Sequence, residues 1–152
     1  METGDALPQA AVTLADGTKL DLDSLVGKPV VIYFYPKADT PGCTREAEDF
    51  TRLADEFSAA GVEVIGVSKD APAALAKFAA KRALTVRLAS DDTGAVCDAF
   101  GVWGEKQMYG KTYMGIERAT FLFGRDGTLV QCWRKVKVPG HAEEVLDAAR
   151  AL

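Results

Sequence analysis

The sequence predicts an α/β fold in which a central mixed β-sheet is flanked by helices. Two short, continuous apolar runs, residues 29–35 and 62–67, are typical of strands that are buried on both faces. Segments with helical spacing of apolar residues follow each run, so strands and helices alternate. Hairpin signals near both ends of the chain add antiparallel strands, which makes the expected sheet mixed.

The first elements along the chain are a small N-terminal β-hairpin and a buried strand. Residues 11–14 and 19–22 flank Asp16-Gly17, a turn pair that predicts the hairpin. Residues 24–27 form a short turn. The run 29–35 consists of β-forming residues and predicts the buried strand.

A helix is expected to follow this strand and to reach Gly61, a residue that commonly ends helices. Its apolar positions recur at helical spacing, as expected for one face packed on the sheet. These positions are Ala47, Phe50, Leu53, Ala54 and Phe57.

The middle of the chain continues the alternation. After the strand at 62–67, Asp70-Ala-Pro72 opens an Ala-rich helix that runs to about Arg82. Residues 84–89 are a third strand candidate. Asp92-Thr-Gly then leads into a short helix through Cys97 to Phe100.

The last third is predicted to hold a loop, a hairpin and a final helix. Residues 101–115 are rich in Gly, Lys and aromatic residues and read as a loop. Strands at 118–123 and 128–135 are joined by the turn at 124–127. The final helix starts at Pro139-Gly-His and faces the core with Val145, Leu146 and Ala149. This element order is thioredoxin-like, and with no linker or repeat we expect one domain over residues 1–152.

Composition excludes several classes of function. A net charge of −4 leaves no basic footprint for nucleic acid or an anionic membrane. No apolar segment is long enough for a signal peptide or a membrane span, so we expect a cytoplasmic protein. With three separated cysteines and one histidine, a zinc site or disulfide framework is not expected. The thiols are left with catalysis, redox sensing or packing.

The most informative stretch is the turn Thr40-Pro-Gly-Cys43 between the buried strand and the long helix. Thr40 is a good N-cap, and Pro41 then occupies the first helical position, where its missing N–H costs nothing. Cys43 falls at the third helical position, facing unpaired backbone donors and the positive end of the helix dipole. This placement favours the thiolate, the reactive form of cysteine.

The same residues carry a family resemblance. Pro36-x-x-x-Thr40-x-x-Cys43 matches the signature of peroxiredoxins, and the block 33–47 resembles the peroxiredoxin Q, or bacterioferritin comigratory protein, branch. The match continues collinearly through residues 100–116, Arg118-x-Thr-Phe-Leu, 133–138 and 140–145, so it spans nearly the whole chain.

The resemblance implies a thioredoxin-like fold and an antioxidant enzyme that reduces hydrogen peroxide and organic hydroperoxides without a metal or organic cofactor. Cys43 would be the peroxidatic cysteine, oxidised to sulfenic acid. Thr40 and Arg118 would be its polar partners, and Pro36 would shield the pocket. Thioredoxin, glutaredoxin or a low-molecular-weight thiol would be the reductant, and the usual form in this branch is a monomer.

Three further residues near the motif have possible supporting roles. Glu46 lies one turn after Cys43 and is placed to orient an arginine, or is only an acidic residue near a helix start. Thr40 has two compatible roles, because its hydroxyl is expected to cap the Cys43 amide and to contact peroxide or sulfur. Tyr35 is a candidate pocket residue, whereas Trp103 is expected in the core.

The resolving step departs from the family pattern. Members of this branch often carry a resolving cysteine five residues after the peroxidatic one, where this chain has Glu48, or in the next helix, near Ala79 or Ala80. Three routes therefore remain open: reduction by an external thiol, which is favoured; a disulfide with Cys97; and a disulfide with Cys132. Alternation with Val130 predicts a half-buried Cys132.

Two other classes of function compete with a peroxidase. A thioredoxin-type thiol–disulfide oxidoreductase needs a second cysteine three residues after Cys43, where Glu46 stands. A binding domain on the same scaffold would give no reason for Thr40, Cys43 and Arg118 to occur together. A cysteine that only senses redox state would react with hydrogen peroxide about as slowly as free cysteine.

Overall fold

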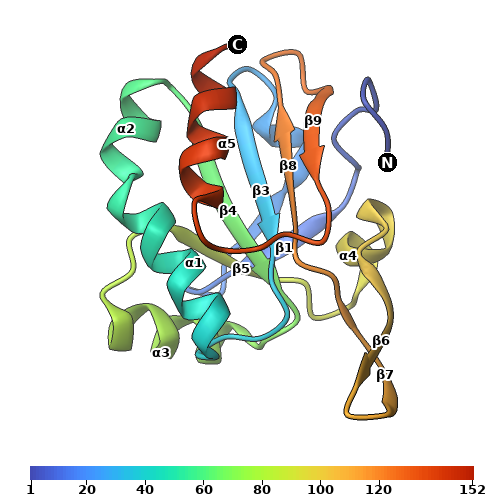
Figure 1. The fold of residues 1–152 in the computed structure, drawn as a ribbon. Helices are drawn as coiled ribbons and strands as arrows, with labels where there is room; N and C mark the ends of the chain where they lie inside the picture. The colour runs from blue at the N-terminus through green and yellow to red at the C-terminus, as the bar shows by residue number, and fades with distance from the viewer.

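A seven-stranded mixed sheet forms the centre of the protein, seen here in a computed structural model that describes residues 1–152 (Figure 1). The strands lie in the order β2-β1-β5-β4-β3-β8-β9. Their bounds are Ala11–Leu14 (β1), Lys19–Asp21 (β2), Val30–Phe34 (β3), Glu63–Ser68 (β4), Arg87–Ser90 (β5), Ala119–Phe123 (β8) and Leu129–Trp133 (β9). The predicted α/β class is confirmed.

Strand β3 is the part of the sheet that positions the site. It pairs in parallel with β4 and antiparallel with β8, and all five of its residues are buried. Ile32 and Phe34 point into one apolar layer, whereas Val31, Tyr33 and Tyr35 point into the other. A strand covered on both faces has no polar alternation, as expected from its continuous apolar run.

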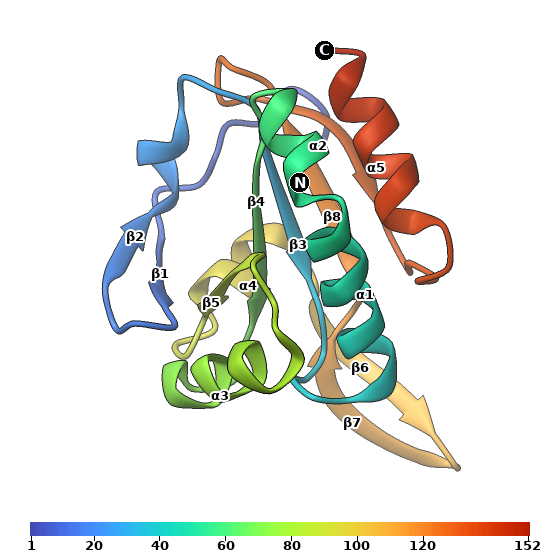
Figure 2. The ribbon, with the colours of Figure 1, turned by 90° about the vertical axis from the view of Figure 1, so that its left-hand side faces the viewer.

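Helices cover the two faces of the sheet unequally. The layer that contains Tyr33 is built by α1 (Pro41–Arg52), α2 (Ala54–Ala59), α3 (Pro72–Arg82) and α5 (His141–Arg150). Figure 2 shows α1, α2 and α5 gathered on one side of β3. The opposite layer contains α4 (Ala95–Phe100), and the short 3-10 helix η1 (Leu22–Leu25) adds Leu22 to it.

Two expectations about the elements are wrong. The helix predicted up to Gly61 is interrupted at Leu53, which has φ −94° and ψ 6°, so α1 and α2 are separate. Residues 101–115 are not a loop, because Trp103–Met108 (β6) and Lys111–Ile116 (β7) form a two-stranded hairpin that projects from the body (Figure 1). Tyr109 and Gly110 make its turn with φ 53° and 75°.

None of the helices combines the length and the apolar character needed to cross a membrane.

Candidate active site

Cys43 lies in the first turn of α1, just after the loop that connects β3 to this helix. The chain leaves β3 through Tyr35 and Pro36, and Thr40 takes the N-cap position in extended conformation, with φ −95° and ψ 156°. Pro41 is then the first helical residue and Cys43 the third, as predicted. The Cys43 side chain is buried, with the residue only 2% exposed. Its sulfur thus sits at the positive end of a 12-residue helix.

Arg118 joins Cys43 to Glu46. It lies in the link between β7 and β8, and its Nη2 donates a hydrogen bond of 3.3 Å to Sγ of Cys43. Its Nη1 donates one of 2.6 Å to Oε1 of Glu46. Gly42 makes room for this approach, because a Cβ there would lie 3.2 Å from Nη2. One guanidinium therefore bridges a thiol and a carboxylate from the same helix.

The ion pair between Arg118 and Glu46 is largely shielded from solvent. The Glu46 side chain is 1% exposed and that of Arg118 is 16% exposed. Burial raises the pKa of Glu46 to about 7, although Arg118 acts to lower it. Burial acts to lower the pKa of Arg118, but Glu46 and Cys43 outweigh it, and that pKa lies above its usual value. Oε2 of Glu46 has no hydrogen-bond partner.

Thr40 does not cap the helix through its side chain. Its hydroxyl donates a 2.7 Å hydrogen bond to the carbonyl of Lys37 instead of accepting from the Cys43 amide, so the predicted capping contact is wrong. The hydroxyl has turned back into the tight 37–40 turn. Thr40 does line a hollow on the protein surface together with Pro36, the first residue of the motif.

The 37–40 turn is fixed from two sides by residues that sequence reasoning missed. Oδ2 of Asp70 accepts hydrogen bonds from the Ala38 amide, at 2.8 Å, and from the Ser68 hydroxyl, at 2.7 Å. Asp39 adopts a φ of 60° and pairs with two basic residues at the end of α3: Lys81 at 2.7 Å and Arg82 at 3.1 Å. Asp70 and Asp39 carry no local sequence signal for these long-range contacts.

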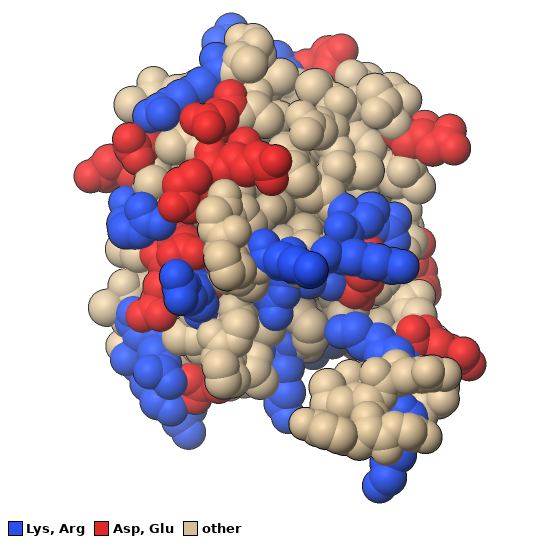
Figure 3. Space-filling view, in the orientation of Figure 1, with Lys and Arg blue, Asp and Glu red and all other residues tan.

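A hollow of about 510 Å³ opens between this turn and the β6–β7 hairpin. Its lining is mostly apolar and aromatic with three lysines at the edge: Pro36, Lys37, Thr40, Lys69, Trp103, Lys106, Met108, Tyr113, Met114, Gly115 and Ile116. Figure 3 shows the hairpin as a largely uncharged projection at the lower right, set off from the body by a gap with blue side chains around it.

The supporting aromatic residues are arranged differently from the prediction. Tyr35 is 1% exposed and lies in the same apolar layer as Cys43, beneath the site. Trp103 is not in the core: it is 36% exposed and lines the hollow. The reason is that the hairpin carrying it stands off the main sheet.

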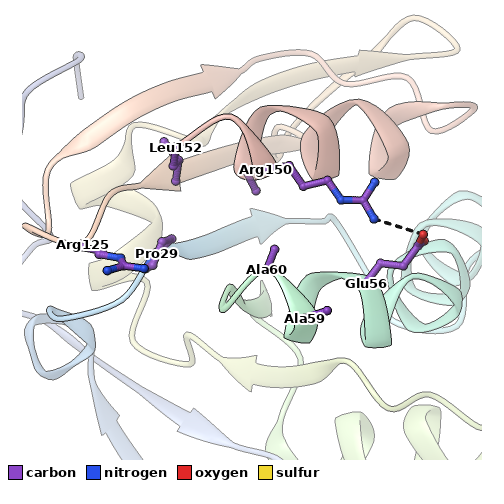
Figure 4. Close-up of a pocket in the computed structure, with 8 residues that line it drawn as sticks. Pro29, Glu56, Ala59, Ala60, Arg125, Arg150 and Leu152 are labelled. Atoms are coloured by element: carbon purple, nitrogen blue, oxygen red, sulfur yellow. Dashed lines mark hydrogen bonds and ion pairs between the residues drawn. The ribbon is translucent and has the colours of Figure 1, made fainter.

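The largest hollow, of about 680 Å³, lies between α2 and the end of α5 (Figure 4). It is lined by Pro29 and Arg125 and by the ion pair of Glu56 with Arg150. Pro29 precedes β3 and Pro36 follows it, so this hollow is at the opposite end of the strand from Cys43. None of the three cysteines lines it.

The other two cysteines lie away from Cys43. Cys97 is fully buried in the apolar layer on the other face of the sheet. Burial, with the Asp91 carboxylate beside it, raises the pKa of the Cys97 thiol far above its usual value. Cys132 is exposed, so its predicted half-burial is wrong. It lies on β9, the edge strand, opposite Phe121, where no helix covers it.

A resident metal has no set of ligands here, because no three His, Cys, Asp or Glu side chains converge. The fold and the pairing of Cys43 with Arg118 define a thioredoxin-fold protein whose site is built around a single cysteine at a helix N-terminus.

Comparison with known proteins agrees with this class. The AhpC/TSA family model matches residues 3–132. The chain is 49% identical to peroxiredoxin Bcp of Xanthomonas campestris pv. campestris over 92% of this chain and 88% of that protein. It is 42% identical to peroxiredoxin Bcp of Escherichia coli K12, with coverage of 97% and 94%.

Solved structures give the same result. The bacterioferritin comigratory protein of X. campestris superimposes with a TM-score of 0.90 at 47% identity, covering 97% of this chain and 98% of that one. A cysteine-to-serine variant of Xylella fastidiosa PrxQ gives 0.94 at 41% identity, with coverage of 99% and 96%. The predicted thioredoxin-like fold is confirmed.

The chain belongs to the AhpC/TSA family, and within it to the Bcp, or peroxiredoxin Q, branch. It is a peroxiredoxin, a thiol-dependent peroxidase that takes a hydroperoxide as substrate and a thiol as reductant.

Proposed function

We propose that Cys43 is the nucleophile that reduces the hydroperoxide. The observation that carries this assignment is the 3.3 Å hydrogen bond from Arg118 to its sulfur. A free thiol is only a few per cent ionised at neutral pH and needs activation. The guanidinium beside Sγ and the helix N-terminus beneath it both stabilise negative charge there.

The oxidative step is a displacement at oxygen. The Cys43 thiolate attacks the terminal oxygen of R–O–OH, the S–O bond forms, and the O–O bond breaks. Both electrons of the O–O bond leave with the alkoxide, which takes a proton from solvent to become R–OH, or water when the substrate is hydrogen peroxide. Arg118 stabilises the charge as it moves from sulfur to the leaving oxygen.

The hollow beside the site supports a substrate range that includes organic hydroperoxides. Its apolar side chains from β6 and β7, such as Met108 and Met114, provide a surface for an alkyl group. The X. campestris relative is described as reducing alkyl peroxides.

We propose further that an external thiol reduces the Cys43 sulfenic acid. The first thiol forms a mixed disulfide and releases water, and a second releases the Cys43 thiol. The burial of Cys97 beyond the sheet supports this route, because a disulfide with Cys43 would require one of them to leave its apolar layer. The alternative disulfide with Cys132 would have to join the edge strand to α1.

Thioredoxin, glutaredoxin or a small thiol would fit this route as reductant. The proposal also includes a monomeric, cytoplasmic enzyme. The hydrogen bonds that join Cys43, Arg118 and Glu46 are made within one chain, so this part of the site can form in a monomer. Three unpaired cysteines suit a reducing compartment.

Replacement of each cysteine by serine tests the assignment. Cys43→Ser is expected to abolish peroxide consumption, while Cys97→Ser and Cys132→Ser keep most of the single-turnover oxidation seen by stopped-flow tryptophan fluorescence. Unchanged peroxide reactivity in Cys43→Ser would overturn the proposal.

A further inference from the structure

The charges that touch Cys43 do not balance when its thiol and Glu46, whose pKa is about 7, are both ionised. Arg118 is then the only cation in direct contact with two anions, the thiolate and the Glu46 carboxylate. Both anions are almost completely removed from solvent. Uncompensated charge is costly in such a place, so a second cation nearby would favour the ionised thiol.

Lys106 is placed to be that cation. It lies on β6, and its stem crosses the neighbouring strand β7 at Gly115, where a Cβ would meet Cδ of Lys106 at 3.0 Å and Cγ at 3.8 Å. The stem therefore lies flat over a residue with no side chain. Lys106 lines the hollow together with Pro36 and Thr40, the motif residues that precede Cys43.

No carboxylate neutralises Lys106, which takes part in none of the salt bridges of the protein. The nearby Glu117 is already paired with Arg134 at 2.8 Å. Of the other lysines of the hollow, Lys69 stands over the Trp103 ring at 4.2 Å, and Lys37 also faces the hollow beside α3. The charge of Lys106 is therefore free to act on the site.

Lys106 also lies within the field of the reacting groups. Its burial and the charge of Arg118 lower its pKa, while Cys43 and Glu117 act in the opposite direction. A negative charge on Cys43 and the positive charge of Lys106 therefore favour each other, and Lys106 shares the lining of the hollow with the motif residues Pro36 and Thr40.

We propose that Lys106 is a second positioning cation of the active site, which favours the Cys43 thiolate and the charge that builds on the departing alkoxide. This inference rests on the proposed role of Cys43. Lys106 acts through the electric field at the mouth of the hollow. Arg118, by contrast, acts through direct hydrogen bonds.

The test compares Lys106→Met, which keeps the length of the stem and removes the charge, with Lys106→Arg, which keeps the charge. The matched control is Lys111→Met, an exposed lysine at the far end of the same hairpin that does not line the hollow. Two quantities are measured across pH 5–9 in the reduced proteins: the second-order rate with hydrogen peroxide, and the rate of iodoacetamide alkylation of the Cys43 peptide by mass spectrometry.

In Lys106→Met we expect the peroxide rate at pH 6 to fall roughly threefold to tenfold. The midpoint of the alkylation profile should rise by about half a unit to one unit. Lys106→Arg and Lys111→Met should match the wild type within a factor of about two. The inference is overturned if Lys106→Met gives wild-type profiles, or if Lys106→Arg is as impaired as Lys106→Met.

Failure of the underlying assignment would look different. If Cys43 is not the nucleophile, Cys43→Ser keeps its peroxide reactivity whatever stands at position 106. If only the inference about Lys106 fails, Cys43→Ser is inactive while Lys106→Met behaves like Lys111→Met.

Discussion

The guanidinium of Arg118 is held by the buried carboxylate of Glu46, over a distance of 2.6 Å. This contact joins the helix that carries Cys43 to the link that precedes β8, 72 residues further along the chain. The contact through Nη1 fixes the orientation of the guanidinium, so that Nη2 faces Sγ of Cys43. Under the proposed function, the reactivity of Cys43 depends on Glu46, a residue that need not touch peroxide.

Replacing Arg118 by lysine should disable the site although the charge is retained. A single ammonium group cannot donate to Glu46 and Cys43 at once with the planar geometry of a guanidinium. We expect the second-order rate with hydrogen peroxide to fall about 100-fold. A rate within threefold of wild type would show that charge alone is sufficient.

The free energy of unfolding should depend on pH in a way that reveals the raised pKa of Glu46. Its pKa is about 7 in the folded protein against an ordinary value of 4.5, so the folded state binds the proton more tightly than the unfolded chain. This contribution to stability is complete below pH 4.5 and is lost as pH rises through 7. Relative to wild type, Glu46→Gln should therefore gain on the order of 3 kcal/mol between pH 4.5 and 8.

Urea unfolding of both proteins at several pH values measures this difference. His141, whose pKa is lowered to about 4 by burial and then by Arg118, titrates in both proteins and cancels in the comparison. Parallel stability curves for the two proteins would contradict the assignment of a raised pKa to Glu46.

Gly66 should tolerate no side chain. A Cβ there would lie 2.5–2.8 Å from ring atoms and the hydroxyl of Tyr33, which is fully buried and stacked on Phe50. Gly66→Ala should lower the free energy of unfolding by about 3 kcal/mol. Gly104→Ala is the control, because nothing lies within 4 Å of its Cβ and its φ is not positive. Equal stability of the two variants would be inconsistent with this packing.

The ion pairs of Asp39 should keep the 37–40 turn folded. Asp39→Ala removes the contacts to Lys81 and Arg82 and keeps a residue with a side chain at a positive φ. Amide hydrogen exchange in residues 37–44 should then be several-fold faster, whereas exchange in β8 is unchanged. If the amides of the turn exchange as slowly as in wild type, the hydrogen bond from Ala38 to Asp70 is sufficient to keep the turn folded.

Local signals predicted much of this architecture. The continuous apolar run of β3, the Pro41 start of α1 and the position of Cys43 depend on near neighbours in sequence, and all are confirmed. The contact between Arg118 and Glu46 was suggested only by the spacing of Glu46 on the helix and by the family resemblance. The two residues are 72 positions apart in the sequence, so no local pattern can predict their contact.

The errors share a cause, because each depended on tertiary context. The β6–β7 hairpin has a sequence like that of a loop, because most of its residues are exposed and apolar and polar residues do not alternate along it. The hydroxyl of Thr40 donates a hydrogen bond to the Lys37 carbonyl and therefore does not accept one from the Cys43 amide. Cys132 has the alternation of a half-buried strand but lies on an edge that nothing covers.

The most direct test of the account is to trap the product of one turnover. The reduced protein is treated with one equivalent of hydrogen peroxide in the presence of dimedone, without added thiol, and mapped by mass spectrometry. A single dimedone adduct on Cys43, with Cys97 and Cys132 still reduced, is the predicted result. A disulfide between Cys43 and either of the other cysteines, or an adduct on Cys97 or Cys132 alone, would contradict it.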